Sequence, residues 1–538
     1  MKNQLILSIA LYSILSVTSI ASTSTNGFKT VENSTKKTNI IFKLADDTGE
    51  VNNIAESNPD IIKSNSHKIV ETHRYHSDFR INKADKYVQV SSKNHKYLQL
   101  SDGTPYIPVG LNICWPRFET DEEKVMVWME NDFRKLAENG GNYIRIWLSA
   151  PFYELEYKNA YEYDFTKARR IDRILEHASK YGIKVKFCFE NFRELTNSPA
   201  PFPGSVPFDK PIYHVSNGGP LNTMDEYFGS DKGKNLFLKK LEFFSNRYAH
   251  NPNVYAWELW NEINAANTSD SLISSWTREM LIKGHEYFPN HLVIQSLGGF
   301  ENERDIKVYK EYSLFKNNDI AQVHRYLNPG AGLEVCKGPM DILAADAVRQ
   351  IISYNTEKPV ILAEVGAVEA HHAGPSKLYD VDKQGVLLHD LLFAPFFSGA
   401  AAPGHSWHWD FYIEKNNLWW HFGRFNEAIK GINPITEDFQ PLFTEDSNLR
   451  NYILKGKNTV LIWCRDKVSD WQSELVEGKK AEKLSNLTID VSKMDIAANA
   501  AVEFYLPWEN KWQKGKLEEK KVSLPEFTRS LVIRITKK

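Results

Sequence analysis

The sequence predicts an α/β fold, a (β/α)8 barrel followed by a small all-β sandwich domain. Between residues 107 and 432, strand-like segments alternate with helix-like segments, a pattern typical of a parallel sheet covered by helices. After residue 434 the apolar residues recur with period two and no helix is expected, which indicates the sandwich. The 538 residues are enough for a barrel of roughly 250 residues and a smaller partner.

The start of the chain has the pattern of a signal peptide. Lys2 precedes a mostly apolar run over residues 5–17, and Ser19 and Ala21 suit cleavage before Ser22. We therefore expect a signal peptide over residues 1–21 and a chain that is secreted, periplasmic or at the cell surface, without a membrane span. The other boundaries are expected at 22–85 for a linker or N-terminal extension, 86–433 for the barrel with an N-terminal hairpin, and 434–538 for the sandwich.

Turn residues and apolar periodicity place the elements of the barrel. Alternating segments around the turn sequence SDGTP predict a hairpin that begins near residue 86. Residues 192–231, rich in Pro, Gly and Asn, predict a long loop that forms a wall of a binding groove. The expected strands are 107–113, 142–148, 183–189, 255–262, 292–297, 319–326, 359–364 and 400–409, with further strands at 459–464, 487–491, 501–506 and 530–535 in the sandwich. The expected helices are 121–139, 165–181, 232–250, 270–288, 305–315, 340–355, 382–397 and 422–432.

Glu262 stands at the end of the fourth expected strand, in the segment YAWELWNEIN at residues 255–264. Trp257 and Trp260 lie in the same segment. Partial desolvation by indole rings raises the pKa of a carboxyl group, so Glu262 is a candidate general acid that protonates a leaving oxygen.

A second glutamate, Glu364, ends the apolar run of PVILAEVG at residues 359–366. Two strands therefore each present a carboxylate at the C-terminal end. Carboxylates roughly 5 Å apart suit a retaining glycosidase, and a gap of roughly 6.5–9.5 Å suits an inverting one. The sequence leaves this distance open, and ordinary ion pairs are the alternative for both residues.

The WNE motif after one strand and the AEVG strand that follows resemble the clan A glycoside hydrolases, most closely the family 5 cellulases and mannanases. The resemblance covers about residues 87–432. It implies an eightfold barrel, retention of configuration, Glu262 as the acid/base and Glu364 as the nucleophile. Asn261 is expected to hold the sugar 2-hydroxyl group, where hydrogen bonds strengthen in the transition state.

Three more candidates for sugar binding lie on barrel strands. Alternation along 142–148 turns Arg145 inward, where it needs a partner, and family 5 has an arginine in this strand that would keep Glu364 ionised. His324 and Tyr326 are two positions apart, share one face of a strand, and match a His-x-Tyr pattern of the family.

The remaining candidates close other strands. The family has a tryptophan at the end of strand eight, which corresponds to Trp407 or Trp409, and we favour Trp407 as the stacking floor. The first strand ends at Asn112 and is followed by Trp115. Glu190 follows the third, where family 5 members generally have a histidine, so the subfamily and the substrate stay open.

Composition and motifs argue against other classes of function. The 66 basic and 68 acidic residues leave a net charge of −2, so no nucleic-acid partner is expected. His371 and His372 lie near Glu369, but no zinc motif organises the histidines and no metal or other cofactor is expected. The four cysteines are widely spaced and are expected in the core, with a single disulfide as the alternative.

The predicted function is that of a secreted, monomeric, retaining O-glycoside hydrolase without a cofactor. It would act within a β-linked hexose polysaccharide, either β-mannan or β-glucan, by double displacement. The alternatives are an exo-acting β-glycosidase of the same clan and a barrel that binds carbohydrate without turnover.

Overall fold

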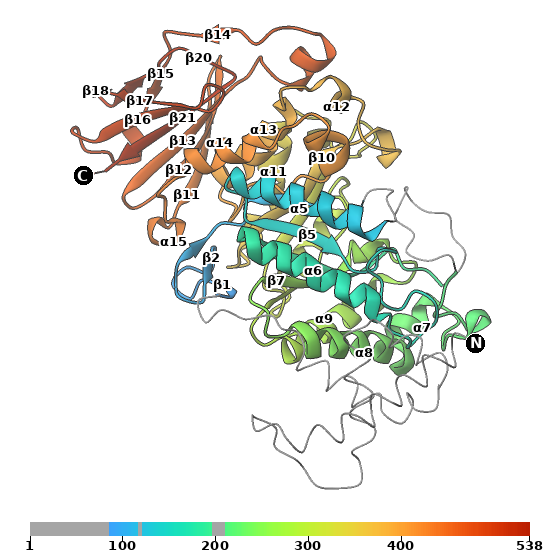
Figure 1. Cartoon of the computed structure of the whole chain (residues 1–538). Coiled ribbons are helices and arrows are strands. Elements are labelled where there is room, and N and C mark those ends of the chain that lie inside the picture. Colours follow the sequence, from blue (N-terminus) through green and yellow to red (C-terminus); the bar gives the residue numbers. More distant parts are fainter. Residues whose placement is uncertain (1–85, 117–120, 196–209, 538) are drawn as a thin grey trace, which may run out of the picture. The chain divides into compact units, whose positions relative to one another are not determined.

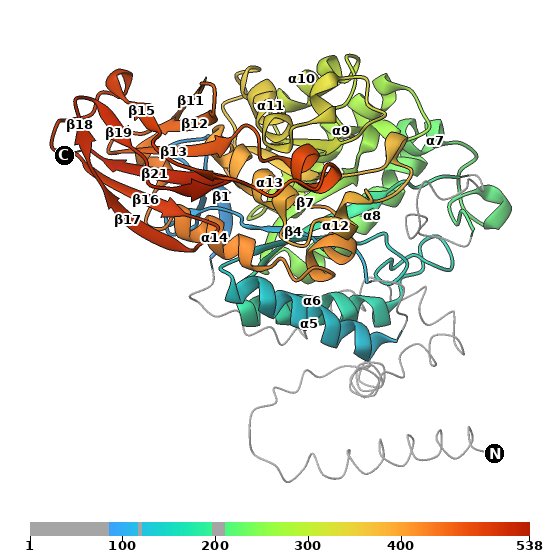
Figure 2. The same cartoon turned by 90° about the horizontal axis from the view of Figure 1, so that it is seen from above.

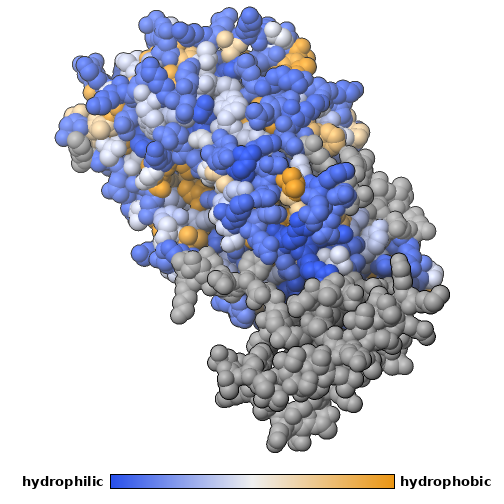
Figure 3. Space-filling model, viewed as in Figure 1, coloured by the Kyte–Doolittle hydropathy of each residue, from blue (hydrophilic) through white to orange (hydrophobic). Residues whose placement is uncertain are grey.

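The computed structural model describes residues 86–116, 121–195 and 210–537 (Figure 1). The predicted signal peptide and N-terminal extension lie outside the described residues, as does the middle of the predicted loop 192–231. None of the helices in the described part of the chain combines the length and the apolar character that a membrane span requires. The face shown in Figure 3 is mainly hydrophilic, with apolar residues in small separate groups.

Parallel strands form the centre of the larger part of the molecule. One sheet contains β4 (Gly110–Asn112), β5 (Tyr143–Trp147), β6 (Lys184–Asn191), β7 (Val254–Asn261) and β8 (Leu292–Ile294) in sequence order, and a second pairs β9 (Ala321–Leu327) with β10 (Val360–Ala367). Helices alternate with these strands, and both views show α5 and α6 side by side (Figures 1 and 2). The helices are α5 (Glu122–Glu138), α6 (Phe165–Tyr181), α7 (Met224–Gly229), α8 (Asp231–Tyr248), α9 (Asp270–Tyr287), α10 (Asp305–Ser313), α11 (Met340–Ile352), α12 (Leu378–Val381), α13 (Val386–Phe397), α14 (Trp420–Ala428) and α15 (Pro434–Glu437).

Ser406 connects the two parallel sheets. It forms parallel bridges to Leu111 of β4 and to Val365 of β10. The regular strand predicted at 400–409 is nevertheless wrong, because these residues make only isolated bridges. Pro403 has no N–H to donate, which interrupts a ladder. Among the described residues β8 and β9 are also not paired with each other, so the sheets do not form a closed ladder. The predicted α/β class is confirmed.

Side-chain alternation along β5 follows the prediction. Ile144 and Ile146 belong to the hydrophobic core that the strands share with the helices. Arg145, between them, is completely buried on the opposite face of the strand. The strand therefore presents a guanidinium group to the interior of the sheets.

Helix ends follow from capping residues. The Asp121 side chain accepts a hydrogen bond from the Lys124 N–H at the start of α5, and Gly182, with φ 67°, ends α6 in the left-handed conformation. The predicted loop 192–231 is wrong at its end, because it contains α7. Three large side chains of α7, Met224, Tyr227 and Phe228, are buried, and their spacing forms one helical face too short to give a clear period.

The predicted hairpin is present and has a third strand. Its antiparallel sheet shares a buried cluster with Tyr143 and Tyr255, at the beginnings of β5 and β7. The hairpin therefore packs at the end of these strands opposite to Glu262. Its strands are β1 (Val88–Val90), β2 (Leu98–Leu100) and β3 (Pro105–Tyr106).

The C-terminal part is rich in antiparallel strands, shown in orange and red in Figure 2. A six-stranded sheet has the order β11-β12-β13-β21-β16-β17, and smaller sheets pair β14 with β20 and β15 with β19 and β18. Ile462 of the large sheet and Val522 of a small sheet belong to one buried cluster. The expectation of no helices is wrong, since α15 begins at Pro434, whose fixed φ suits a first helical position. The strands are β11 (Gln440–Glu445), β12 (Leu449–Lys455), β13 (Thr459–Asp466), β14 (Lys483–Leu484), β15 (Thr488–Asp490), β16 (Ala501–Leu506), β17 (Lys511–Gly515), β18 (Leu517–Glu518), β19 (Lys521–Ser523), β20 (Phe527–Thr528) and β21 (Ser530–Thr536).

Helix α13 joins the two parts. All its residues are buried, because it contacts β10 on one side and β12 and β13 on the other. Arg465 of β13 donates two hydrogen bonds to Asp390 of α13, at 2.7 and 3.1 Å. Arg450 of β12 pairs in the same way with Asp341 of α11, at 2.6 and 3.0 Å. These forked pairs lie in the buried contact between helices and sheet.

Breaking one of these pairs is expected to destabilise the whole unit. Arg465→Met should lower the free energy of unfolding by about 3–5 kcal/mol, because the Asp390 carboxylate would remain buried without its partner. Arg465→Met combined with Asp390→Leu should recover much of this loss. Urea denaturation of the full chain measures both, with Lys483→Met as the control, since the side chains of Lys483 and Glu526 in that pair are 64% and 62% exposed. Equal losses in Arg465→Met and Lys483→Met would contradict this role.

Candidate active site

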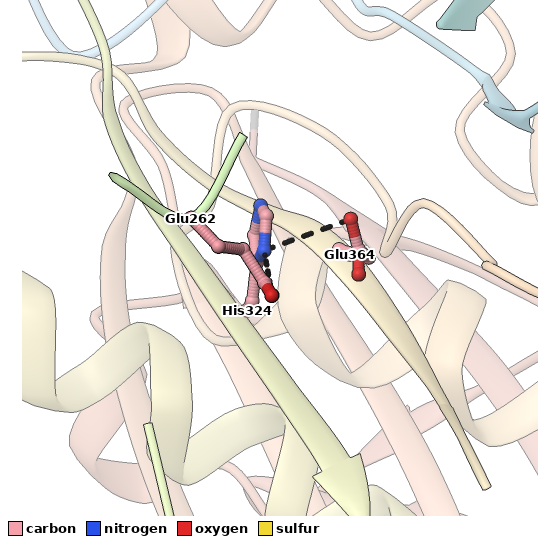
Figure 4. Close-up of side chains that lie close together, drawn as sticks. All are labelled: Glu262, His324 and Glu364. Atoms are coloured by element: carbon pink, nitrogen blue, oxygen red, sulfur yellow. Dashed lines mark hydrogen bonds and ion pairs between the residues drawn. The ribbon is translucent and has the colours of Figure 1, made fainter. Parts of the chain in front are cut away.

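Glu262, His324 and Glu364 meet where β7, β9 and β10 approach their C-terminal ends (Figure 4). His324 Nδ1 lies 2.9 Å from Glu262 Oε1 and 3.6 Å from Glu364 Oε2. This nitrogen and one carboxylate oxygen from each glutamate all lie within 4.8 Å of one another. The structure thus brings together the two glutamates singled out from the sequence.

The backbone of Glu262 departs from the strand. With φ 51° and ψ 51° it adopts the left-handed conformation, and its N–H donates to Ser296 Oγ at 3.0 Å. A non-glycine residue in this region is strained and persists where the surroundings determine it, as often happens at functional sites. This turn places the Glu262 side chain, which is 17% exposed, just beyond the C-terminal end of β7.

Arg145 is the hub of the site, because each of its five N–H donors has an acceptor. Nε and Nη2 donate to the two oxygens of Glu258, at 2.8 and 2.9 Å. Nη1 donates to Glu364 Oε2 at 2.6 Å and to Asn112 Oδ1 at 3.4 Å, and Nη2 also donates to Asn261 Oδ1 at 2.7 Å. The predicted contact between Arg145 and Glu364 is therefore present. Glu258, which the sequence reasoning missed, holds the plane of the guanidinium.

Asn261 and Tyr326 complete the surroundings of Arg145 and Glu364. Because the amide oxygen of Asn261 accepts from Arg145, its NH2 group is left to donate to a ligand hydroxyl. The Tyr326 hydroxyl donates to Glu364 Oε1, so both oxygens of Glu364 accept hydrogen bonds. Such bonds stabilise a carboxylate in its ionised form.

The charges of the buried groups balance when Glu262 carries a proton. Burial, followed by the charge of Glu364, raises the pKa of Glu262 well above its usual value. Burial also raises the pKa of Glu364, but Arg145 and the Tyr326 hydroxyl oppose that rise. Burial lowers the pKa of Lys186 to about 8, so its ammonium stays charged at neutral pH. Two cations, Arg145 and Lys186, then face two carboxylates, Glu258 and Glu364. Of the two neighbouring acids Glu262 and Glu364, Glu262 is the one that holds the proton.

The predicted desolvation of Glu262 is present, but Trp257 and Trp260 do not supply it. Trp257 packs against Phe189 and Phe288, and Trp260 packs against Trp276, all on the helix side of the sheet. Burial of Glu262 on the interior side of the strands, followed by the charge of Glu364, raises the pKa of Glu262. Proximity in the sequence did not predict which side of the strand the indoles face.

A cluster of tryptophans borders the site. Trp407 contacts Trp115 and Trp147, with ring centroids 5.5 and 5.2 Å apart. Trp407 and Trp115 are partly exposed, whereas Trp409 is buried. The arrangement favours Trp407 over Trp409 as a ring on which a sugar can stack, and Trp115 lies beside it.

Two predicted residues are not placed to meet a ligand directly. Asn112 is completely buried and its amide donates to backbone carbonyls of Ala363, His405 and Ser406, so it supports the site from beneath. The side chain of Glu190 points away from the site. The Glu190 carboxylate accepts from Arg193 and from Lys240 of α8, at 2.8 and 2.6 Å. A buried carboxylate requires such partners, and α8 offers one on the outside of β6.

The sequence that forms this site also matches a protein-family model. The model of cellulase, glycosyl hydrolase family 5, matches residues 102–387. The chain belongs to glycoside hydrolase family 5. The resemblance suggested by WNE and AEVG is thereby confirmed.

Curated relatives in family 5 are distant in sequence. The chain is 22% identical over 228 residues to mannan endo-1,4-beta-mannosidase 4 of Oryza sativa subsp. japonica. This match covers 40% of the chain and 48% of the rice protein. It is 24% identical over 211 residues to a probable mannan endo-1,4-beta-mannosidase F of Aspergillus flavus, covering 36% of this chain and 42% of that protein. The chain thus spans about half the length of the relatives it matches.

Solved structures share the fold. A glycoside hydrolase is similar with a TM-score of 0.54 and 12% identity, over 84% of this chain and 97% of that one. A glycoside hydrolase of family 5 from Bacteroides vulgatus has a TM-score of 0.51 and 14% identity, over 84% of this chain and 93% of that one. Because these alignments cover 84% of the chain, they include residues beyond those that the family 5 model matches.

Glu258 and Lys186 are the site residues that sequence reasoning missed. Both are buried, and Lys186 Nζ lies 3.4 Å from Glu258 Oε2. The alternation that turned Arg145 inward was a usable signal, since an inward arginine requires a carboxylate partner and Glu258 lies on β7, an inner strand of the same sheet.

The Glu262, His324 and Glu364 ligand atoms are close enough together to hold a cation. Each of them, however, already has a partner, and the Arg145 guanidinium lies 2.6 Å from Glu364 Oε2. A cation would compete with that guanidinium for the same oxygen. The absence of a metal from the chemistry of this family 5 chain stays a prediction.

Proposed function

We propose that this chain is a retaining glycoside hydrolase that cleaves β-mannan within the polymer. The compact pair of Glu262 and Glu364 carries the proposal, because oxygens within 4.8 Å fit the roughly 5–5.5 Å between carboxyl groups of retaining enzymes. The names of the curated relatives support mannan as the substrate. The likeness to solved glycoside hydrolases supports a closed (β/α)8 barrel. We also propose that the C-terminal strands form a β-sandwich, that the chain is exported through residues 1–21, and that it is a monomer.

The proposed reaction has two displacements. In the first, Glu364 Oε attacks the anomeric carbon while Glu262 gives its proton to the glycosidic oxygen, so a sugar–enzyme ester forms and the leaving saccharide departs. In the second, Glu262, now ionised, takes a proton from water, whose oxygen attacks the same carbon and releases Glu364 as a carboxylate. Configuration is retained because each step inverts it.

The neighbours of the glutamates have defined roles in this scheme. Arg145 and Tyr326 hold Glu364 ionised and oriented, and Asn261 offers its NH2 group to the 2-hydroxyl of the reacting sugar. Trp407 offers a ring for stacking. His324, whose pKa burial holds well below its usual value, stays neutral beside Glu262 and preserves the proton there.

Hydrolysis of a panel of soluble β-mannans and β-glucans by the full chain tests the function. We expect a ladder of oligosaccharides from mannan in particular, and retention of configuration at the new reducing end by NMR during early turnover. Monosaccharide as the sole early product would indicate exo action. Binding of mannan without any turnover would overturn the proposal in favour of a carbohydrate-binding barrel.

The pH dependence of kcat/KM follows from the raised pKa of Glu262. An acid with a raised pKa keeps its proton at higher pH, so activity should extend above the ordinary carboxyl range and fall as pH rises through that pKa. Activity should fall at low pH as Glu364 becomes protonated. Glu262→Gln should remove the alkaline limb for an aryl glycoside, whose leaving group needs no proton. An unchanged alkaline limb in this variant would assign that limb to another group.

A further inference from the structure

The loop after β10 carries an imidazole that the proposed mechanism does not use. The side chain of His372 is 43% exposed, yet its Nε2 lies 2.9 Å from Oε1 of Glu301, whose side chain is 7% exposed. The ring of His372 also stands edge-on to Tyr326, with centroids 5.1 Å apart and planes at 81°. No hydrogen-bond partner of its Nδ1 is found among residues 86–116, 121–195 and 210–537.

Glu301 is a fixed anchor for this imidazole. Its second oxygen accepts from Asn328 Nδ2 at 2.7 Å, and its N–H donates to Asp305 Oδ2 at 3.0 Å. Because Nε2 of His372 faces this carboxylate, the other ring nitrogen, Nδ1, points away from Glu301. A hydroxyl group can both donate and accept, so it can bond to Nδ1. The pair therefore presents Nδ1 in a determined orientation on the surface of the loop.

The backbone of the loop is held as firmly as the side chain. His371 and His372 are consecutive residues with left-handed φ values of 58° and 57°. The Asn328 side-chain oxygen accepts from both the His371 N–H and the Gly330 N–H, at 3.2 and 2.9 Å. A Cβ at Gly330 would lie 2.6 Å from the His371 nitrogen, so only glycine permits this approach. Strained backbone of this kind is concentrated at functional sites, including those that bind a ligand.

The pair lies on the side of the site where Glu262 stands. Glu301 follows a turn whose Gly298 lies against Glu262, since a Cβ at Gly298 would be 3.8 Å from that of Glu262. The charge of Glu301 is also among the causes that raise the pKa of Glu262. Glu262 is the group that protonates the leaving oxygen in the proposed function, on which this inference rests. We propose that His372, oriented by Glu301, binds a hydroxyl group of the saccharide that leaves.

Two substrates with the same glycon and different leaving groups test this role. Para-nitrophenyl β-mannotrioside places an aryl group where mannohexaose places a sugar. His372→Ala and Glu301→Gln should each lower kcat/KM for mannohexaose about tenfold, the value of one lost hydrogen bond, and change it less than about twofold for the aryl substrate. His371→Ala is the matched control in the same loop and should change neither value.

A second measurement separates this inference from the proposed function. In Glu364→Gln, which binds without turnover, adding His372→Ala should weaken mannohexaose binding by about the same tenfold factor in calorimetry. Equal losses on both substrates, or unchanged binding of mannohexaose, would overturn the assignment of His372. No hydrolysis of either substrate by the native chain would overturn the proposed function, whereas a weakened binding in the double variant would still support His372 as a saccharide contact.

Discussion

Glu364→Gln is expected to lower kcat on mannan by at least about 10³-fold, because an amide cannot form the sugar–enzyme ester. The amide oxygen can still accept from Arg145, which preserves the shape of the site. Binding of substrate should therefore change little, and the melting temperature should stay close to that of the native chain. Kinetics on mannan and calorimetry with mannohexaose measure the two effects.

A smaller variant at the same position identifies the nucleophile. In Glu364→Ala, azide should enter the vacated space and attack the anomeric carbon of an aryl β-mannoside, with the aryl group leaving. One inversion then gives the α-glycosyl azide, whereas the native chain retains the β configuration. The control is Glu369→Gln, in the loop that follows β10, where the glutamate pairs with exposed Lys377. Full activity of Glu364→Gln, or a β-glycosyl azide, would contradict the nucleophile assignment.

Arg145→Met is expected to cost about 3–5 kcal/mol of unfolding free energy and most of the activity, because it leaves Glu258 and Glu364 buried with less positive charge. Arg145→Lys keeps the charge but has three N–H donors and no planar fork, so it cannot serve Glu258 and Glu364 together. It should retain more stability than Arg145→Met while losing about 10²-fold in kcat/KM. Urea denaturation and kinetics on the aryl substrate measure both.

A compensating change distinguishes charge from packing. Glu258→Gln added to Arg145→Met should recover part of the lost stability, because it removes one unpaired carboxylate. Arg170→Met is the control, since Arg170 pairs with Glu122 in a partly exposed position, with 19% and 29% exposure of the two side chains. If Arg145→Met were no more destabilising than Arg170→Met, the hub role of Arg145 would be wrong.

Local chemistry explains what was predictable in the fold. Helix α6 begins and ends where the sequence indicates, because an Asp164 cap and the left-handed Gly182 act within a few residues of the chain. Residues 400–409 were less predictable. Their small apolar residues suggested a strand, yet pairing depends on the neighbours β4 and β10, and Pro403 withholds a donor from them.

The sequence alone determined the alternation that turns Arg145 inward and the two strands that end near Glu262 and Glu364, since period and turn chemistry are properties of adjacent residues. Only the tertiary structure decided how close the two carboxylates lie, that Glu258 shares Arg145, and that Glu190 faces Lys240. It also decided that His372 pairs with Glu301 rather than with the nearer Glu369. These contacts join residues far apart in the chain, and burial selects among partners that sequence spacing cannot rank.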